Sequence, residues 1–192
     1  MPKYIGLVRG INVGGNNPLK MSDLKAICEA AGFTNVQTYV NSGNVIFDAR
    51  SPSNLAKKIE DGIRRSAGLD VRVVVRTPGE LRAAIAANPF PVGPMREPKR
   101  MMITFLSDTP PAASRAAFLA ACEAFPEEVH LEGRELYIYY GDGAGPARSK
   151  LANLPLEKKL GVTGTARNWN TVTKLLELAT SSNGRQPATD ND

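Results

Sequence analysis

The sequence predicts an α+β protein made of two copies of one unit, each with the order strand, helix, strand, strand, helix, strand and then a further helix. Three observations predict it. Short apolar runs of strand character alternate with segments whose apolar residues recur at helical spacing. The segments follow one another in the same order in both halves of the chain. A proline-rich run, continuing to Pro98, separates the halves and is typical of a linker.

The first half is defined by its turns and caps. Asn41-Ser-Gly-Asn44 between two apolar runs indicates a hairpin. Ser51 followed by Pro52 predicts a helix start with proline in the favoured first position. Thr77-Pro-Gly-Glu80 has the spacing of a capping box and predicts the start of the additional helix. The expected strands are 3–8, 36–40, 45–47 and 71–76, and the expected helices are 21–31, the segment from 52, and 77–87.

The second half repeats this order. Its expected strands are 100–106, 128–131, 135–140 and 162–166, and its expected helices are 111–124, 149–160 and 170–179. Pro155 interrupts the middle helix, because proline cannot continue a helical hydrogen-bond ladder. The order is that of a ferredoxin-like unit, so the sequence predicts a tandem repeat. The predicted divisions are a domain at 1–88, a linker at 89–98, a domain at 99–180 and a disordered polar tail at 181–192.

Composition favours a cytoplasmic protein without membrane contact. Of 192 residues, 42% are hydrophobic and 22% charged, and no apolar run approaches the ~20 residues that span a bilayer. The N-terminus begins in a strand pattern and lacks the apolar core of a signal peptide. Cys28 and Cys122 fall in alanine-rich helical segments and are expected to be buried thiols, not a disulfide. With His130 as the single histidine, we expect neither a metal nor a cofactor.

The positive charge is concentrated in one half. Residues 1–95 carry 12 basic and 7 acidic side chains, whereas residues 96–192 carry 12 of each, so the net charge of +5 belongs to the first half. Such a bias attracts anions to that half. It is nevertheless much smaller than the charge of dedicated nucleic-acid binders. Scattered lysines and arginines also keep a surface soluble, and that alternative stays open.

Three polar strings carry the candidate functional residues: Arg9–Gly15, Tyr39–Asn44 and Thr165–Thr171. Glycines permit positive φ and close backbone approach, arginine offers a fork suited to phosphate or carboxylate, and asparagine both donates and accepts hydrogen bonds. None of these groups is a general base or an activated nucleophile. The predicted ligand-binding residues are Arg9, Asn12, Gly14, Gly15, Lys20, Asn41, Ser42, Asn44, Arg167, Asn168 and Asn170.

Topology predicts that the first two strings meet. Right-handed crossovers place the second strand parallel to the first, so the loops that leave them lie at the same end of the sheet. There, Arg9–Gly15 and Asn41–Asn44 would form a cradle for an anion, with Lys20 at the start of the first helix adding positive potential.

Each string also has a purely structural interpretation. Asn-Ser-Gly-Asn makes a hairpin turn without any ligand, and Arg9 could simply bridge the two halves. Asn168 or Asn170 could cap the last helix, or Arg167 beside them could form a second anion contact. The glycine string has neither the Rossmann spacing nor the Gly-Lys-Ser/Thr of a phosphate-binding loop.

These strings, together with the Asn88-Pro-Phe90 step, resemble the bacterial family catalogued as domain of unknown function 1697. The resemblance covers residues 3–178. It implies a two-part α+β fold of ferredoxin-like units and supplies no activity, cofactor or catalytic residue.

Three functions follow from the strings. The first is a binding module for a nucleotide, a phosphorylated metabolite or RNA, as a monomer or homodimer. The second is an enzyme on such a ligand, in which Arg9, Arg167 and asparagine amides stabilise a transition state and Tyr39 or Lys20 donates a proton. The third is an interaction protein whose polar strings only fasten the two repeats together.

Overall fold

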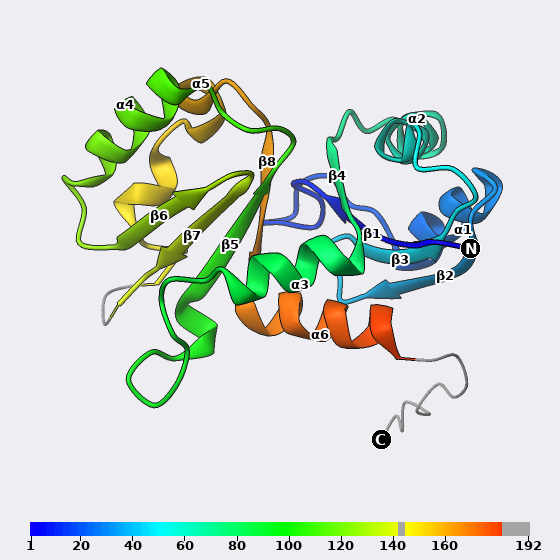
Figure 1. The fold of residues 1–192 in the computed structure, drawn as a ribbon. Helices are drawn as coiled ribbons and strands as arrows, with labels where there is room; N and C mark the ends of the chain where they lie inside the picture. The colour runs from blue at the N-terminus through cyan, green and yellow to red at the C-terminus, as the bar shows by residue number, and fades with distance from the viewer. Residues whose placement is uncertain (142–144, 182–192) are drawn as a thin grey trace.

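The computed structural model describes residues 1–141 and 145–181, so the tail predicted at 181–192 lies outside the described residues except for Ser181. The chain forms an α+β fold with two four-stranded sheets (Figure 1). The first half contains β1 (Lys3–Val8), α1 (Met21–Ala30), β2 (Thr34–Tyr39), β3 (Asn44–Asp48), α2 (Leu55–Ala67), β4 (Val73–Arg76) and α3 (Pro78–Ala86). The second contains η1 (Pro98–Arg100), β5 (Met101–Leu106), α4 (Ala112–Cys122), β6 (Glu128–Glu132), β7 (Glu135–Tyr139), η2 (Lys150–Asn153), α5 (Leu156–Leu160), β8 (Gly164–Asn168) and α6 (Trp169–Thr180).

Both sheets are antiparallel and have corresponding strand orders. The first is ordered β2-β3-β1-β4 and the second β6-β7-β5-β8. Their registers also correspond, because Leu7 of β1 lies opposite Asn44 and Phe105 of β5 lies opposite Glu135. In each sheet the central strands are therefore the first and third of their half.

Three apolar clusters hold the sheets and helices together. The first lies between the first sheet and helices α1 and α2, and the second between the other sheet and α4 with α5. The third draws residues from both sheets and from α3 and α6, including Leu7, Phe105, Leu81 and Leu175. Because β1 and β5 are covered on both faces, their sequences are continuous apolar runs and not alternating ones.

Helices α3 and α6 lie side by side beneath the two sheets (Figure 1). Each follows the last strand of its half, and together they cover the junction between the halves. The capping box predicted at the start of α3 is confirmed, since Thr77 Oγ1 accepts from Glu80 N at 3.2 Å and Thr77 N donates to Glu80 Oε2 at 2.7 Å. Two otherwise unpaired groups of the helix start are thereby satisfied.

One predicted helix start is wrong. Helix α2 begins at Leu55, not Pro52, because Asn54 has a φ of 58° and redirects the chain just before the helix. The predicted interruption at Pro155 is confirmed, because the helical stretch of the second half is divided there into η2 and α5.

Both cysteines are buried and free, as expected. Across residues 1–141 and 145–181, no helix combines the length and apolarity that crossing a membrane requires.

Candidate ligand site at the N-terminal loops

The loop after β1 and the hairpin between β2 and β3 meet at the same end of the first sheet. Val8 N donates to Gly43 O at 2.8 Å, and the Asn12 side chain donates to Asn41 O at 2.8 Å. Strings about thirty residues apart in the sequence are therefore in direct contact, as the crossover topology predicts.

The first loop folds back on itself as a small hairpin. Val13 and Asn16 form an isolated antiparallel bridge, and Asn16 N donates to Val13 O at 3.0 Å. Gly14 and Gly15 occupy the two turn positions with φ values of 56° and 81°, which a side chain would make costly. These two glycines form the turn itself and lie exposed at its tip.

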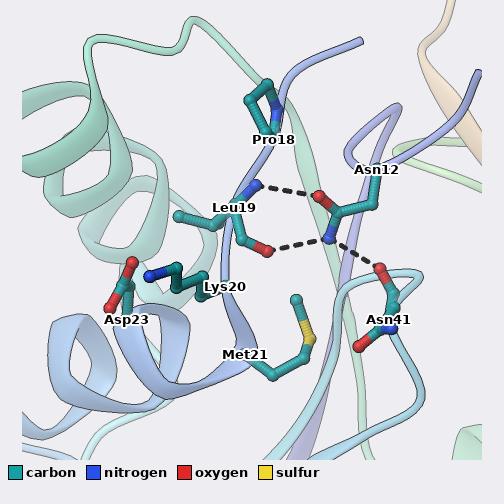
Figure 2. A pocket seen from close by; sticks show the side chains of 7 residues that line it. All are labelled: Asn12, Pro18, Leu19, Lys20, Met21, Asp23 and Asn41. Atoms are coloured by element: carbon teal, nitrogen blue, oxygen red, sulfur yellow. Dashed lines mark hydrogen bonds between the residues drawn. The ribbon is translucent and has the colours of Figure 1, made fainter. Parts of the chain in front are cut away.

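Asn12 joins three segments through one side chain. Its Oδ1 accepts from Leu19 N at 2.9 Å, and its Nδ2 donates to Leu19 O and to Asn41 O, both at 2.8 Å (Figure 2). Asn12 also has a φ of 55°, a conformation that asparagine tolerates better than most residues. Its amide thus holds the site together and has little capacity left for a ligand.

Beside this bridge is an open pocket of about 580 Å³. It is lined by Asn12, Pro18, Leu19, Lys20, Met21, Asp23 and Asn41 (Figure 2). Lys20 is the N-cap residue of α1, and no side chain caps this helix.

Two polar side chains of the pocket have no partner in the described part of the chain. Within the described residues, neither the Lys20 ammonium nor the Asn41 side-chain amide makes a hydrogen bond or an ion pair, and both residues are exposed. Asp23 contributes a carboxylate, which accepts from Ser22 Oγ at 3.3 Å. The pocket therefore presents a cation, an amide and a carboxylate at the positive end of a helix.

Backbone strain lies next to the pocket. Val40 has a φ of 48°, although a β-branched side chain strongly disfavours the left-handed region. Its side chain is 47% exposed, so burial does not compensate for the strain. Strain of this kind persists where surrounding contacts impose it, and here the neighbouring Asn41 carbonyl is bonded to Asn12.

Arg9 does not join this pocket. Its guanidinium forms an ion pair with Glu157 Oε2 at 3.2 Å and lines a different groove, against the second half of the chain. The prediction that Arg9 contributes to one cradle with Lys20 and Asn41 is therefore wrong, because its guanidinium pairs with Glu157 and lines another groove. Its position agrees with the alternative that Arg9 bridges the halves.

Arg167 reaches the N-terminal loops but is fully occupied there. The residue is 6% exposed, and its Nε donates to Asn44 Oδ1 at 2.6 Å. Nη2 donates to Val8 O at 2.7 Å and Ser42 O at 3.0 Å, and Nη1 donates to Thr165 Oγ1 at 2.6 Å. Burial lowers the pKa of this guanidinium to about 10. Arg167 therefore has no N–H donor left for a ligand.

Asn44 and Ser42 belong to the same fastening. Asn44 is fully buried, and its Nδ2 donates to Tyr39 O at 2.9 Å and Ser42 Oγ at 3.0 Å. With its Oδ1 bonded to Arg167, Asn44 has no group left to offer a ligand. Ser42 likewise accepts through both its carbonyl and its hydroxyl, so both residues are structural.

Asn168 and Asn170 sit at the start of α6. Asn168 Oδ1 accepts from Asn170 N at 3.0 Å, which makes Asn168 the N-cap residue, and its Nδ2 donates to Lys99 O at 2.8 Å. Among the described residues, neither asparagine contacts the pocket at Lys20 through a side-chain hydrogen bond. The structure therefore agrees with the alternative that one of these asparagines, Asn168, caps the last helix.

The sequence interpretation missed Arg76. Arg76 is 2% exposed, and Arg167 is 6% exposed at the corresponding place in the second half. Arg76 Nη2 donates to Leu106 O at 2.7 Å and its Nε to Glu135 Oε1 at 3.2 Å. Leu106 ends β5 as Val8 ends β1, so each half sends an arginine from its last strand to the end of the other half's first strand. The sequence signal for this role was an arginine in the last strand of each half. In the structure, Arg76 lies opposite Ile5 of β1 and Arg167 lies opposite Ile103 of β5.

No group of three or more His, Cys, Asp or Glu side chains that could hold a metal ion occurs in residues 1–141 and 145–181. The pocket at Lys20 contains neither cysteine nor histidine.

The sequence was compared with known protein families. Residues 1–137 match the family described as "Protein of unknown function (DUF1697)". The chain belongs to this family. The matched region includes the first two polar strings, whereas the third string, Thr165–Thr171, lies beyond it.

No curated protein matches the sequence. Twelve chains of known structure match. One is the conserved bacterial protein SP0830 from Streptococcus pneumoniae, which has a TM-score of 0.69 and 21% sequence identity, with 93% of this chain and 99% of that chain covered. At this identity, the DUF1697 chain and SP0830 share a fold, and no function follows from the likeness.

Proposed function

We propose that this DUF1697 protein binds a small anionic ligand in the pocket at the start of α1. The supporting observation is that the Lys20 and Asn41 side chains have no partner among the described residues, while Asn12 and its partners hold the two loops in contact. A cationic side chain next to a helix N-terminus attracts negative charge, and the helix start contributes backbone N–H groups.

Asp23 narrows the class of ligand. The Asp23 carboxylate repels an anion that has no hydrogen-bond donors, but it accepts hydrogen bonds from hydroxyl or amino groups of a ligand. A nucleotide or a phosphorylated sugar offers both kinds of group, with phosphate for Lys20 and ribose or base donors for Asp23. We therefore favour these ligands over inorganic phosphate.

Titration calorimetry at low salt tests this proposal with AMP, ATP, a sugar phosphate, inorganic phosphate and a short RNA. We expect the nucleotide or sugar phosphate to bind, and Lys20→Met to weaken binding about five- to tenfold, since a partly exposed charge-assisted hydrogen bond contributes about 1 kcal/mol. Lys25→Met is the matched control, because Lys25 is an exposed lysine of the same helix that does not line the pocket. Absence of binding by every compound, or equal effects of the two substitutions, would refute the proposal.

A structural function is the second candidate, favoured by the contacts of Arg167. The Nε and Nη2 hydrogen bonds of this buried guanidinium fasten the second half to the loops of the first. The two functions are compatible, because different residues carry them. No observation specifically favours the enzyme alternative.

For the architecture, we propose that residues 1–88 and 99–180 are tandem ferredoxin-like units joined by the linker 89–98. The common strand order and register of the two sheets support this division. We further propose a cytoplasmic monomer or homodimer, and the free buried cysteines favour a reducing compartment.

A further inference from the structure

The two halves differ in how their sheets are covered. The second helix of the first half, α2, has 13 residues, whereas α5, at the same place in the second half, has 5. The shorter helix leaves part of the second sheet open beside β8. A groove of about 570 Å³ results, within the range of about 300–1,000 Å³ that is usual for small-molecule sites.

The walls of this groove are largely apolar and come from several elements. Its main apolar side chains are Met102, Phe118, Ile138, Leu151, Leu154 and Leu156. Two hydroxyl-bearing residues, Thr104 and Tyr140, also line it, and neither side chain makes a hydrogen bond within the described residues. An apolar wall with a few unsatisfied polar groups is typical of ligand pockets.

Charged groups lie on one side of the groove. Arg9 enters from the first half and pairs with Glu157 at 3.2 Å. Lys158, the next residue along α5, has no ion-pair partner among residues 1–141 and 145–181. Two cations and one carboxylate leave this edge with one excess positive charge.

We propose that this groove binds a small amphipathic monoanion, an apolar chain or ring system that carries one carboxylate or similar group. The apolar body lies against the exposed wall of the second sheet, since burial of apolar surface is favourable. The anionic group lies at Arg9 and Lys158, where it neutralises the excess charge. Lys20 and Asn41 do not line the groove, so the inference is independent of the function proposed above.

A groove-filling substitution tests the apolar part. Ala166 is exposed on β8 and lines the groove, so Ala166→Phe fills it without removing a core side chain. The probe is anilinonaphthalene sulfonate, an apolar ring system with one anionic group, whose fluorescence rises on binding and falls when decanoate displaces it. Ala166→Phe should weaken both compounds at least about tenfold, the equivalent of excluding two methylene groups.

Ala116→Phe is the matched control, because Ala116 is exposed on α4 and does not line the groove. If Ala166→Phe does not fold, Ala152→Trp fills the groove from η2. Binding to a folded filled variant as tight as to the wild type overturns the proposal, as does absence of binding to the wild type.

The charge requirement has its own test. Arg9→Met and Lys158→Met should each weaken decanoate about threefold, the effect of one exposed ion pair, and leave decanol unchanged. Lys159→Met removes the same charge one residue further along α5 from a side chain that does not line the groove, and it should have no effect. Equal displacement by decanoate and decanol in the wild type overturns the assignment of a monoanion.

Discussion

At the scale of single residues, the residue types in the sequence predicted which side chains gather at the N-terminal loops better than they predicted what those side chains bind. Asn12, Asn41 and Lys20 do gather around one pocket. Arg167 and Asn44 reach the same end of the sheet, but they form their hydrogen bonds with each other and with other groups of the protein. A sequence shows that an arginine can bind an anion, but not that carbonyl oxygens of another segment will reach it first.

Val40 gives a stability prediction. Left-handed backbone costs a β-branched residue about 1–2 kcal/mol, whereas asparagine tolerates it. With a φ of 48° and 47% exposure, Val40 should therefore accept Asn, and Val40→Asn should raise the free energy of unfolding by about 1 kcal/mol in urea titrations. Val13→Asn is the control, because Val13 is 63% exposed and lacks a positive φ. Equal stability changes in the two variants would argue against strain at Val40.

Cys28 gives a pH prediction. Burial raises the pKa of its thiol from 9.0 to about 12, with a smaller contribution from Glu29. The unfolded thiol ionises first, so this contribution to stability is complete below pH 9 and decreases toward pH 12 by up to about 1.4 kcal/mol per pH unit. Thermal unfolding between pH 8 and 10.5 should show a steeper loss for the wild type than for Cys28→Ala. Parallel pH profiles would show that the thiol is not the group responsible.

At the scale of elements, local signals were reliable where one side chain acts on its own helix. The capping box of α3 and the interruption at Pro155 follow from such signals. The start of α2 does not, because Asn54 adopts a left-handed conformation that proline preference alone does not reveal. The groove beside α5 was also not predictable, since it depends on how this short helix packs against the second sheet.

The Thr77 cap can be measured directly. Thr77→Ala removes an acceptor for Glu80 N and a donor to Glu80 Oε2, and it should destabilise the protein by about 1 kcal/mol. Thr173→Ala on α6 should change stability by less than about 0.5 kcal/mol, because the Thr173 hydroxyl only adds to helix carbonyls. Urea denaturation of both variants measures these changes in the free energy of unfolding. A Thr77→Ala effect no larger than that of the control would show that the box contributes little.

At the scale of the whole molecule, the halves share structure that neither can complete alone. One apolar cluster takes side chains from both sheets and from α3 and α6. Arg76 and Arg167 add buried hydrogen bonds in opposite directions across the junction. The order of elements is visible in the sequence, but this docking is not, because it depends on surfaces that exist only after each sheet has formed.

The shared core predicts cooperative unfolding. Because separating the halves exposes the common cluster and leaves two buried arginines without partners, the chain should unfold in one calorimetric transition. The calorimetric and van't Hoff enthalpies should then agree. Two resolved transitions would indicate that the halves fold independently.

The central claim is that Arg167 fastens the second half to the N-terminal loops through Asn44. A double-mutant cycle of Arg167→Met and Asn44→Ala, measured by urea denaturation, tests it most directly. Arg167→Met with Asn35→Ala is the control cycle, since Asn35 bonds to Asp48 and not to Arg167. We predict a coupling of about 1–3 kcal/mol for the first cycle and additivity within about 0.5 kcal/mol for the control. Additivity in both cycles would contradict the account.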